Sequence, residues 1–244
     1  MDIVLVFLVG AFAAFYGAMV GGGGLITIPF LIFLGLPPQM AIATNKVGSL
    51  GLLTGAFLKY FKSGKIQWKV VVPFSVVGVL AGVVGANFML SIDQDLLQKI
   101  IAIVILFILV LIVWKRKVGL EHKETSKTKV VFGYICYFFS MVWGAFFGGG
   151  FGILVSYTLV YLFGFTMIES AATSKIPSFF MGVTAVIVYV VNGVIHLPYA
   201  LAIVVGMFLG GYVGASFAVK RGNKTVKFIF VVVVVVSSIK LLFF

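Results

Sequence analysis

The sequence is poor in charged residues and has almost no cysteine or histidine. Charged residues make up 10% of the 244 positions, and the chain contains six acidic residues, two histidines and one cysteine. The single thiol, Cys136, excludes an internal disulfide and a cysteine-based metal cluster. The chain also lacks a P-loop, a His-Glu-x-x-His motif and a Ser-His-Asp set that could be placed on one side of a membrane. We therefore expect neither ATP hydrolysis nor another enzymatic activity, and no cofactor or metal.

Long polar segments are absent as well. The longest polar stretch, Lys115 to Lys129, is no more than a loop, so a soluble domain is not expected. By contrast, 62% of the residues are hydrophobic and the mean hydropathy is +1.25, whereas soluble domains contain roughly 45 to 50% apolar residues. The apolar runs are continuous and lack a two-residue alternation, which favours membrane helices over β-barrel strands. The composition thus predicts an integral membrane protein.

Ten apolar stretches follow one another along the chain. Eight of them approach or reach the roughly 20 residues that a helix needs to cross a bilayer. The other two, 25–36 and 151–164, are shorter, follow a glycine cluster, and either cross or form re-entrant segments. We expect an all-α polytopic membrane protein with about 8 to 10 membrane segments, some of them broken by glycine. The ten stretches are 3–19, 25–36, 41–60, 69–90, 97–114, 130–147, 151–164, 170–192, 198–219 and 226–244.

The basic residues indicate an orientation. Fourteen of the 18 lysines and arginines lie in three segments, 59–69, 115–129 and 220–227. Because basic loops stay in the cytoplasm, these segments are predicted to be cytoplasmic, which places both termini and the turn at 91–96 outside the cell inner membrane. These loops also account for the net charge of +12. The lipid bilayer is therefore the expected partner, and nucleic acid is not.

Two sequence patterns occur twice. The segment Gly17–Gly23 returns as Gly144–Gly150, and Ala43–Ser49 returns as Ala172–Ser178. The two pairs of segments are separated by almost the same length of chain, so they keep one register. Such self-similarity over half the chain indicates an internal duplication.

The duplication predicts a domain organisation. A first membrane repeat, 1–114, and a second, 130–244, are joined by the basic cytoplasmic loop 115–129. Each repeat holds an odd number of apolar stretches, so the second is expected to be inverted relative to the first. Inverted repeats are typical of transporters that work by alternating access.

A lysine lies inside an apolar stretch of each repeat. Lys46 and Lys175 occupy equivalent positions, and only Glu169 is an acidic residue close to either of them in sequence. Ionisable residues within membrane segments usually mark a transport pathway, and a transported anion would supply the counter-charge that a buried ammonium needs. Alternatively, both lysines extend to the nearest interface. The adjacent polar side chains are expected to line the same site, namely Thr44, Asn45, Thr173 and Ser174.

The glycine clusters suggest the backbone part of this site. Clustered glycine elsewhere, as at Gly78 and Gly82, is explained by close helix packing. A run of four glycines costs roughly 1 kcal/mol per residue inside a helix and should interrupt it. The helix that begins after such a break presents free N–H groups that suit an anion. The expected residues are Gly22, Gly23 and Gly24 in the first repeat and Gly149 and Gly150 in the second.

These motifs resemble those of a known family. They are Gly21–Gly24 followed by Ile28-Pro29, Gly35-Leu36-Pro37-Pro38 and Ala41–Lys46, with a weaker copy from Gly148 to Lys175. Over nearly its whole length the chain is similar to the sulfite exporter TauE/SafE family of bacterial membrane permeases, in a subgroup with Thr-Asn-Lys whose substrates are largely unassigned. The second copy departs further, because Phe151 interrupts its glycines and Thr166 stands in place of Pro37. The resemblance implies export or uptake of small anions such as sulfite or organosulfonates.

The sequence thus predicts a secondary transporter, and more specifically an exporter, of a small anionic substrate. Sulfite, organosulfonates and related sulfur-containing or carboxylate anions are the expected class. Two alternatives stay open: an anion channel with the same site, which a flux assay would separate by its lack of coupling, and a non-transporting membrane scaffold, which would leave the paired lysines unexplained. A homodimer is also left open by the sequence.

Overall fold

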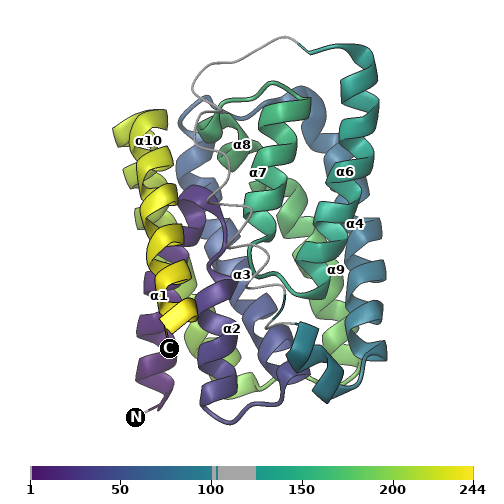
Figure 1. The fold of residues 1–244 in the computed structure, drawn as a ribbon, viewed down its shortest axis with the longest axis vertical. Helices are drawn as coiled ribbons and strands as arrows, with labels where there is room; N and C mark the ends of the chain where they lie inside the picture. The colour runs from purple at the N-terminus through teal and green to yellow at the C-terminus, as the bar shows by residue number, and fades with distance from the viewer. Residues whose placement is uncertain (1, 101–102, 104–124, 244) are drawn as a thin grey trace.

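The regular secondary structure of the described chain is entirely helical. A computed structural model describes residues 2–100, 103 and 125–243, with side chains described as far as Gly222. No strand occurs within these ranges, and the predicted all-α class is confirmed there. Most of the predicted stretch 97–114 and the first part of the predicted loop 115–129 lie outside the described residues. Figure 1 shows the helices α1 (Asp2–Val20), α2 (Gly24–Phe33), α3 (Pro38–Phe61), α4 (Trp68–Ser91), α6 (Lys127–Phe146), α7 (Phe151–Leu162), α8 (Met167–Thr173), α9 (Lys175–Val191) and α10 (Leu197–Phe243).

Five helical segments of the described chain are long and apolar enough to cross a membrane. Helices α8 and α9 together form one of them, and α10 contributes another before it turns at Gly222, whose φ is 78°. The protein is therefore a multi-pass membrane protein. The five segments are Asp2–Met19, Trp68–Ser91, Lys127–Phe146, Met167–Val191 and Leu197–Gly222.

Helices α2 and α7 are too short to cross by themselves. They contain 10 and 12 residues. At about 1.5 Å per residue, twelve residues extend roughly 18 Å, whereas the hydrocarbon core is about 30 Å thick. Helix α3 is long enough at 24 residues, but Lys46, Lys59 and several polar neighbours make it less apolar than the five spans.

The long helices form two groups of three. Helix α10 packs against α1 and α3, which we call the first group, and α4 packs against α6 and α9, which we call the second group. Helices within a group run parallel. A Cβ at Gly206, Gly210 or Gly214 of α10 would lie 2.0 to 2.3 Å from the carbonyl oxygens of Phe7, Ala11 and Phe15 of α1, in that order. Only glycine permits backbones to approach so closely.

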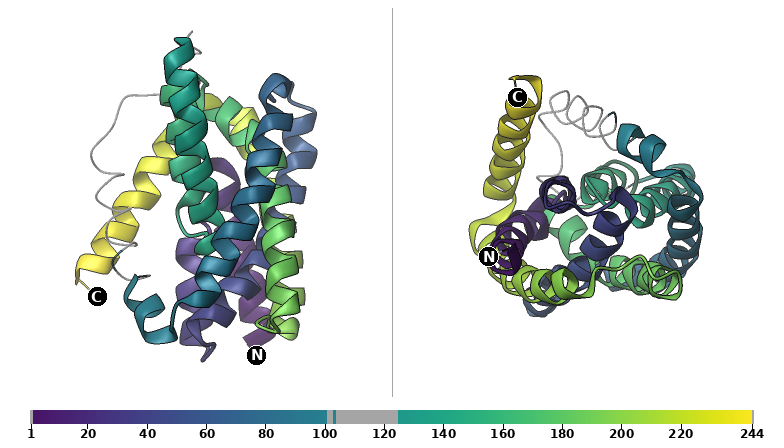
Figure 2. Two further views of the ribbon diagram at one scale, coloured as in Figure 1. Left: turned by 90° about the vertical axis from the view of Figure 1, so that its right-hand side faces the viewer. Right: turned by 90° about the horizontal axis from the view of Figure 1, so that it is seen from below.

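Each group therefore contains helices from both halves of the sequence. The first group takes α10 from the second half, and the second group takes α4 from the first half. Figure 2 shows the bundle from two further sides, with the chain beyond Gly222 leaning away from it. The halves are interleaved, and the repeat boundaries 1–114 and 130–244 stay a prediction.

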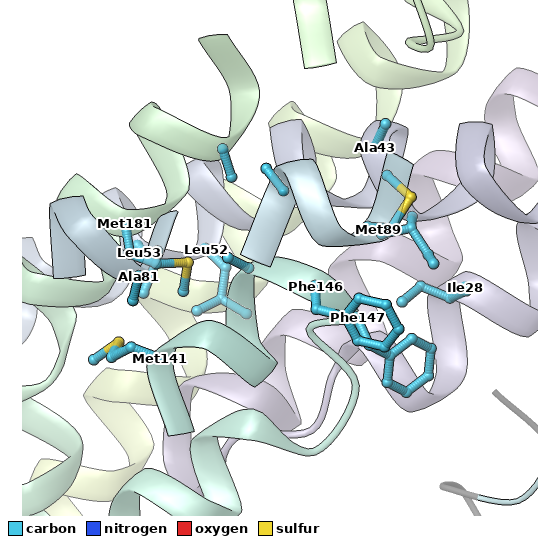
Figure 3. Packing of buried hydrophobic residues seen from close by; sticks show 14 of the residues in the cluster. Ile28, Ala43, Leu52, Leu53, Ala81, Met89, Met141, Phe146, Phe147 and Met181 are labelled. Atoms are coloured by element: carbon cyan, nitrogen blue, oxygen red, sulfur yellow. The ribbon is translucent and has the colours of Figure 1, made fainter. Parts of the chain in front are cut away.

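Apolar side chains fill the interior and also cover the outer faces. Inside, the rings of Phe74 and Tyr137 stack with centroids 4.1 Å apart, and Figure 3 shows another part of the buried cluster around Phe147. Outside, Val72 and Val76 of α4 are 71% and 57% exposed. One turn apart on the helix, they form an apolar face suited to lipid rather than water.

Candidate functional site

A buried cavity of about 60 Å³ lies between the two helix groups, where the two glycine clusters meet. Its wall is made by α1, α2, α3, α7, α8, α9 and α10 and by the connections before α2 and α7. The lining residues are Gly17, Met19, Gly21, Gly22, Gly23, Gly24, Asn45, Lys46, Ser49, Leu52, Leu53, Gly148, Phe151, Gly152, Ser156, Ala171, Ser174, Lys175, Ser178, Met181 and Met207.

Both glycine clusters interrupt the chain's helices at this cavity. Helix α1 ends at Val20 and α2 begins at Gly24, while α6 ends at Phe146 and α7 begins at Phe151. Gly21 has a φ of 80°, which L side chains rarely adopt. A Cβ placed on Gly21 would lie 2.5 Å from the Cα atom of Gly152. The first break therefore touches the start of α7 backbone to backbone.

Lys46 is buried in the cavity wall and has a partner. It is 2% exposed, and its ammonium donates a hydrogen bond to the carbonyl oxygen of Gly144 in α6. That carbonyl lies in the last turn of α6, where carbonyls lack helical partners and the helix dipole is negative. The N–H of Gly148, which could have satisfied it, bonds instead to the carbonyl of Trp143 at 3.3 Å.

Lys175 is buried as well, but its ammonium has no hydrogen-bond partner in the described chain. It is 7% exposed and lies 5.9 Å from the ring centroid of Tyr60. Both lysines are thus buried within the bundle, and the two alternatives for their role, an anion site or extension to the interfaces, stay predictions.

The charge of the cavity is positive. Two lysines line it, and no carboxylate is found among the described residues of its wall. Glu169 faces elsewhere, since its Oε1 atom accepts a hydrogen bond from the side chain of Gln67 at 2.8 Å. No group of three metal-ligating side chains occurs in the described ranges. A buried cation without a counter-ion is costly, so the arrangement can stabilise a small anion.

Comparison with known proteins identifies the family. Residues 6–241 match the family model of the sulfite exporter TauE/SafE. The chain belongs to this family. Its relatives include a probable membrane transporter protein of Haemophilus influenzae (27% identical, over 99% of this chain and 94% of the relative) and YfcA of Escherichia coli K12, also named a probable membrane transporter protein (27%, over 98% and 89%). No solved structure matches.

Membership makes this TauE/SafE protein a membrane transporter and not an enzyme. Of its predicted site residues, the structure brings seven together on the cavity wall. They are Gly22, Gly23, Gly24, Asn45, Lys46, Ser174 and Lys175. Their role in binding stays a prediction.

Four predicted residues of the TauE/SafE protein lie off the wall. Gly149 and Gly150 form the turn before α7, where the indole N–H of Trp143 donates to the Gly149 carbonyl at 3.1 Å and Gly150 has a φ of 70°. Thr44 and Thr173 are fully buried behind the lysines. The structure thus gives these four residues packing and backbone contacts instead of a place beside the cavity.

Thr44 and Thr173 hold the connections that precede α10 and α4. The Thr44 hydroxyl accepts a hydrogen bond from the backbone N–H of His196 at 3.0 Å, and the Thr173 hydroxyl accepts one from the backbone N–H of Gln67 at 3.0 Å. Each threonine therefore accepts a hydrogen bond from the residue just before a helix that comes from the other half of the sequence, and so stabilises the position of that helix.

Replacing either threonine by valine should lower the melting temperature of the purified transporter. Valine keeps the shape but leaves the loop N–H without an acceptor, at a cost of about 1 to 3 kcal/mol. For a chain of this size each kcal/mol corresponds to roughly 2 to 4 °C. Thr44→Ser and Thr173→Ser keep the hydroxyl and serve as controls. Valine and serine variants that melt together would contradict this role.

Three serines of the wall, Ser49, Ser156 and Ser178, were missed by the sequence reasoning. Ser49 and Ser178 end the duplicated segments and lie three residues after Lys46 and Lys175. Residues three apart share a helix face. That spacing is the signal that could have identified them. The apolar part of the wall, such as Met181 and Met207, carries no comparable sequence signal.

Proposed function

We propose that the protein is a secondary transporter of small anions, which it binds in the cavity between the two glycine breaks. The observation that carries this proposal is the presence of two buried lysines, Lys46 and Lys175, in a wall for which no described carboxylate supplies a counter-charge. The side-chain amide NH2 of Asn45 and the hydroxyl of Ser178 add neutral donors that can hydrogen-bond an oxyanion.

The size of the cavity favours a compact substrate. It holds about 60 Å³, while a cavity needs roughly 10 to 15 Å³ to hold one water molecule and sites for drug-sized ligands measure roughly 300 to 1,000 Å³. An anion of a few non-hydrogen atoms fits best, such as sulfite, a short sulfonate or a short carboxylate. Export through the inner membrane is the proposed direction.

Alternating access between two inverted repeats is the proposed mechanism, and equivalent contacts in the two halves support it. The hydroxyl of Tyr60 donates to the carbonyl of Ala18 at 3.0 Å, and that of Tyr189 donates to Ala145 at 2.8 Å. The two alanines follow Gly17 and Gly144 of the duplicated glycine motif, and the two tyrosines align when the lysine motifs are aligned.

A second set of contacts supports the inversion by being reciprocal. Thr44 of the first half holds His196 of the second, and Thr173 of the second half holds Gln67 of the first. The register that aligns Thr44 with Thr173 also aligns Gln67 with His196. Such an exchange is expected when two equivalent units pack around a pseudo-two-fold axis.

The distribution of charge supports a cytoplasmic position for one end of the bundle. The connection from α3 to α4 carries the exposed Lys62 and Lys65. Because helices within a group run parallel, the part of α10 just before Gly222, with Lys220, and the start of α6, with Lys127, lie at this same end (Figure 1). The opposite end carries the exposed Asp93. By the positive-inside rule the lysine-rich end is cytoplasmic and the N-terminus is outside.

A thermal-shift screen on detergent-purified protein tests the function. We expect sulfite, thiosulfate or short sulfonates to stabilise the protein, and saturation at a hundred times the Kd would add about 2.7 kcal/mol, or roughly 5 to 10 °C. The Lys46→Met/Lys175→Met double variant should show no such shift. Lys59→Met, which removes a lysine of α3 outside the cavity, should respond like the unmodified protein. Equal shifts in all three proteins would place the anion elsewhere.

A further inference from the structure

The two lysine sites occupy equivalent positions but make different hydrogen bonds. In the second break the N–H of Gly148 bonds to Trp143, and the Gly144 carbonyl is left for the Lys46 ammonium. In the first break the N–H of Gly21 bonds to the carbonyl of Gly17 at 2.9 Å, so that carbonyl is already in use. Gly17 and Gly144 each begin a copy of the duplicated glycine motif and are therefore equivalent.

The two sides of the cavity also differ in exposure. Ser156, Ser174 and Lys175, on the side nearer the lysine-rich end of the bundle, are 8%, 8% and 7% exposed. Asn45 and Lys46, on the opposite side, are 3% and 2% exposed. All five residues are buried, and the hydrogen bond of Lys46 lies on the side of the cavity away from the lysine-rich end.

The hydrogen bond of Lys46 joins the two helix groups. Lys46 lies on α3 of the first group, and Gly144 lies on α6 of the second. The equivalent bond, from Lys175 on α9 to the carbonyl of Gly17 on α1, would join the same groups from the other side. Gly17 and Lys175 both line the cavity, and the bond would require a movement that brings the two groups together and a Gly17 carbonyl that is shared with or released by Gly21.

We infer that Lys46 and Lys175 exchange two roles during transport, and this inference rests on the proposed function. In the conformation described, the hydrogen bond from Lys46 to Gly144 holds the two helix groups together, a contact that we call the latch. Lys175 is then the cation that contacts the anion. In the opposite conformation Lys175 latches the groups through Gly17, and Lys46 contacts the anion. In either conformation one buried ammonium is bound to a carbonyl oxygen and the other is bound to the transported anion.

The exchange can be tested by cysteine accessibility. The reporter is Met207→Cys, a cavity residue, in a Cys136→Ser background, and a membrane-impermeant maleimide is applied to inside-out and right-side-out vesicles. Lys46→Met removes the latch of the described conformation, so the ratio of cytoplasmic to outside labelling should fall about tenfold, the smallest effect expected for a lost charged hydrogen bond. Lys175→Met should raise the ratio by a similar factor. Lys59→Met is the control and should leave it unchanged.

Opposite shifts in the two variants support the exchange. Shifts in the same direction, a shift in only one variant, or no shift in either would overturn it, and no shift in either would indicate that the bond of Lys46 to Gly144 is equally present in both conformations. Sulfite-induced thermal stabilisation of the same proteins reports on the anion site separately. Stabilisation that depends on both lysines, with an unchanged labelling ratio, would retain the anion site and reject the exchange. Opposite shifts without any sulfite effect would retain the exchange and reject the proposed substrate.

Discussion

Replacing Lys175 by methionine is expected to weaken binding of the transported anion at least tenfold. Methionine keeps an unbranched apolar stem but removes the one cavity cation that has no hydrogen-bond partner in the described chain. A charged donor contributes about 1.5 to 3 kcal/mol to such a contact, which corresponds to one to two decades in Kd. Lys46→Met should lose a similar factor, because it removes the other charge of the same cavity. Isothermal titration with sulfite on purified protein measures both.

Two further variants make this expectation specific to the ammonium in the cavity. Arginine at position 175 should restore binding only in part, because its planar fork presents donors in a different geometry from a point charge on a flexible stem. Lys59→Met removes a lysine that lies over the ring of Tyr212 at 4.1 Å, outside the cavity, and should bind normally. Unchanged affinity in both Lys46→Met and Lys175→Met would exclude the cavity as the anion site.

Alanine at Gly21 is expected to abolish the native packing of the two glycine breaks. Its Cβ would lie 2.5 Å from the Cα atom and 2.7 Å from the carbonyl carbon of Gly152. Backbone atoms cannot move aside as a side chain would, so the breaks must separate. In addition, φ is 80° at Gly21, and a left-handed conformation costs an L residue about 1 to 2 kcal/mol. We expect loss of most folded protein and of transport.

Two other alanine variants separate these causes. Gly152→Ala meets the same backbone, since its Cβ would lie 2.6 Å from the Cα atom of Gly21, but it lies at an ordinary helical position. Gly35→Ala has the left-handed backbone, with φ 91°, and open space around its Cβ. If close approach dominates, Gly152→Ala should resemble Gly21→Ala, while Gly35→Ala should lose only about 1 to 2 kcal/mol. Size-exclusion chromatography and thermal melting distinguish these outcomes; equal mild losses in all three variants would show that the contact is dispensable.

Much of the helical framework could be predicted because the apolar runs are bounded by residues that end helices. The predicted stretches 25–36 and 151–164 correspond to α2 and α7, and 69–90 corresponds to α4. The stretch 170–192 was predicted as one segment, but the structure divides it at Ser174 into α8 and α9. Pro177 explains the division, because its ring clashes with the carbonyl four residues earlier.

The candidate site could be predicted only in part because neighbouring residues on a helix point in different directions. Lys46 was identifiable because charge within a membrane segment is rare. Thr44 lies two residues earlier, and positions two apart face opposite sides of a helix. It therefore faces His196, while Ser49 shares the face of Lys46 and lines the cavity. The pairing of Lys46 with Gly144 depends on helices far apart in sequence and had no local signal.

Each helix group contains helices from both halves of the sequence, and this constrains the order in which the protein can pack in the membrane. Helices α1 and α3 are synthesised early, but the helix that packs closest to them, α10, is the last one described. Until it is inserted, Gly51 and Gly55 lack the backbone against which they fit, since Cβ atoms there would lie 2.2 Å from the carbonyl oxygens of Val204 and Phe208. Helices α1 and α3 are therefore expected to complete their packing only after α10 has been inserted. A chain truncated before Leu197 would lack these backbone contacts, so its first half is not expected to pack as it does in the complete bundle.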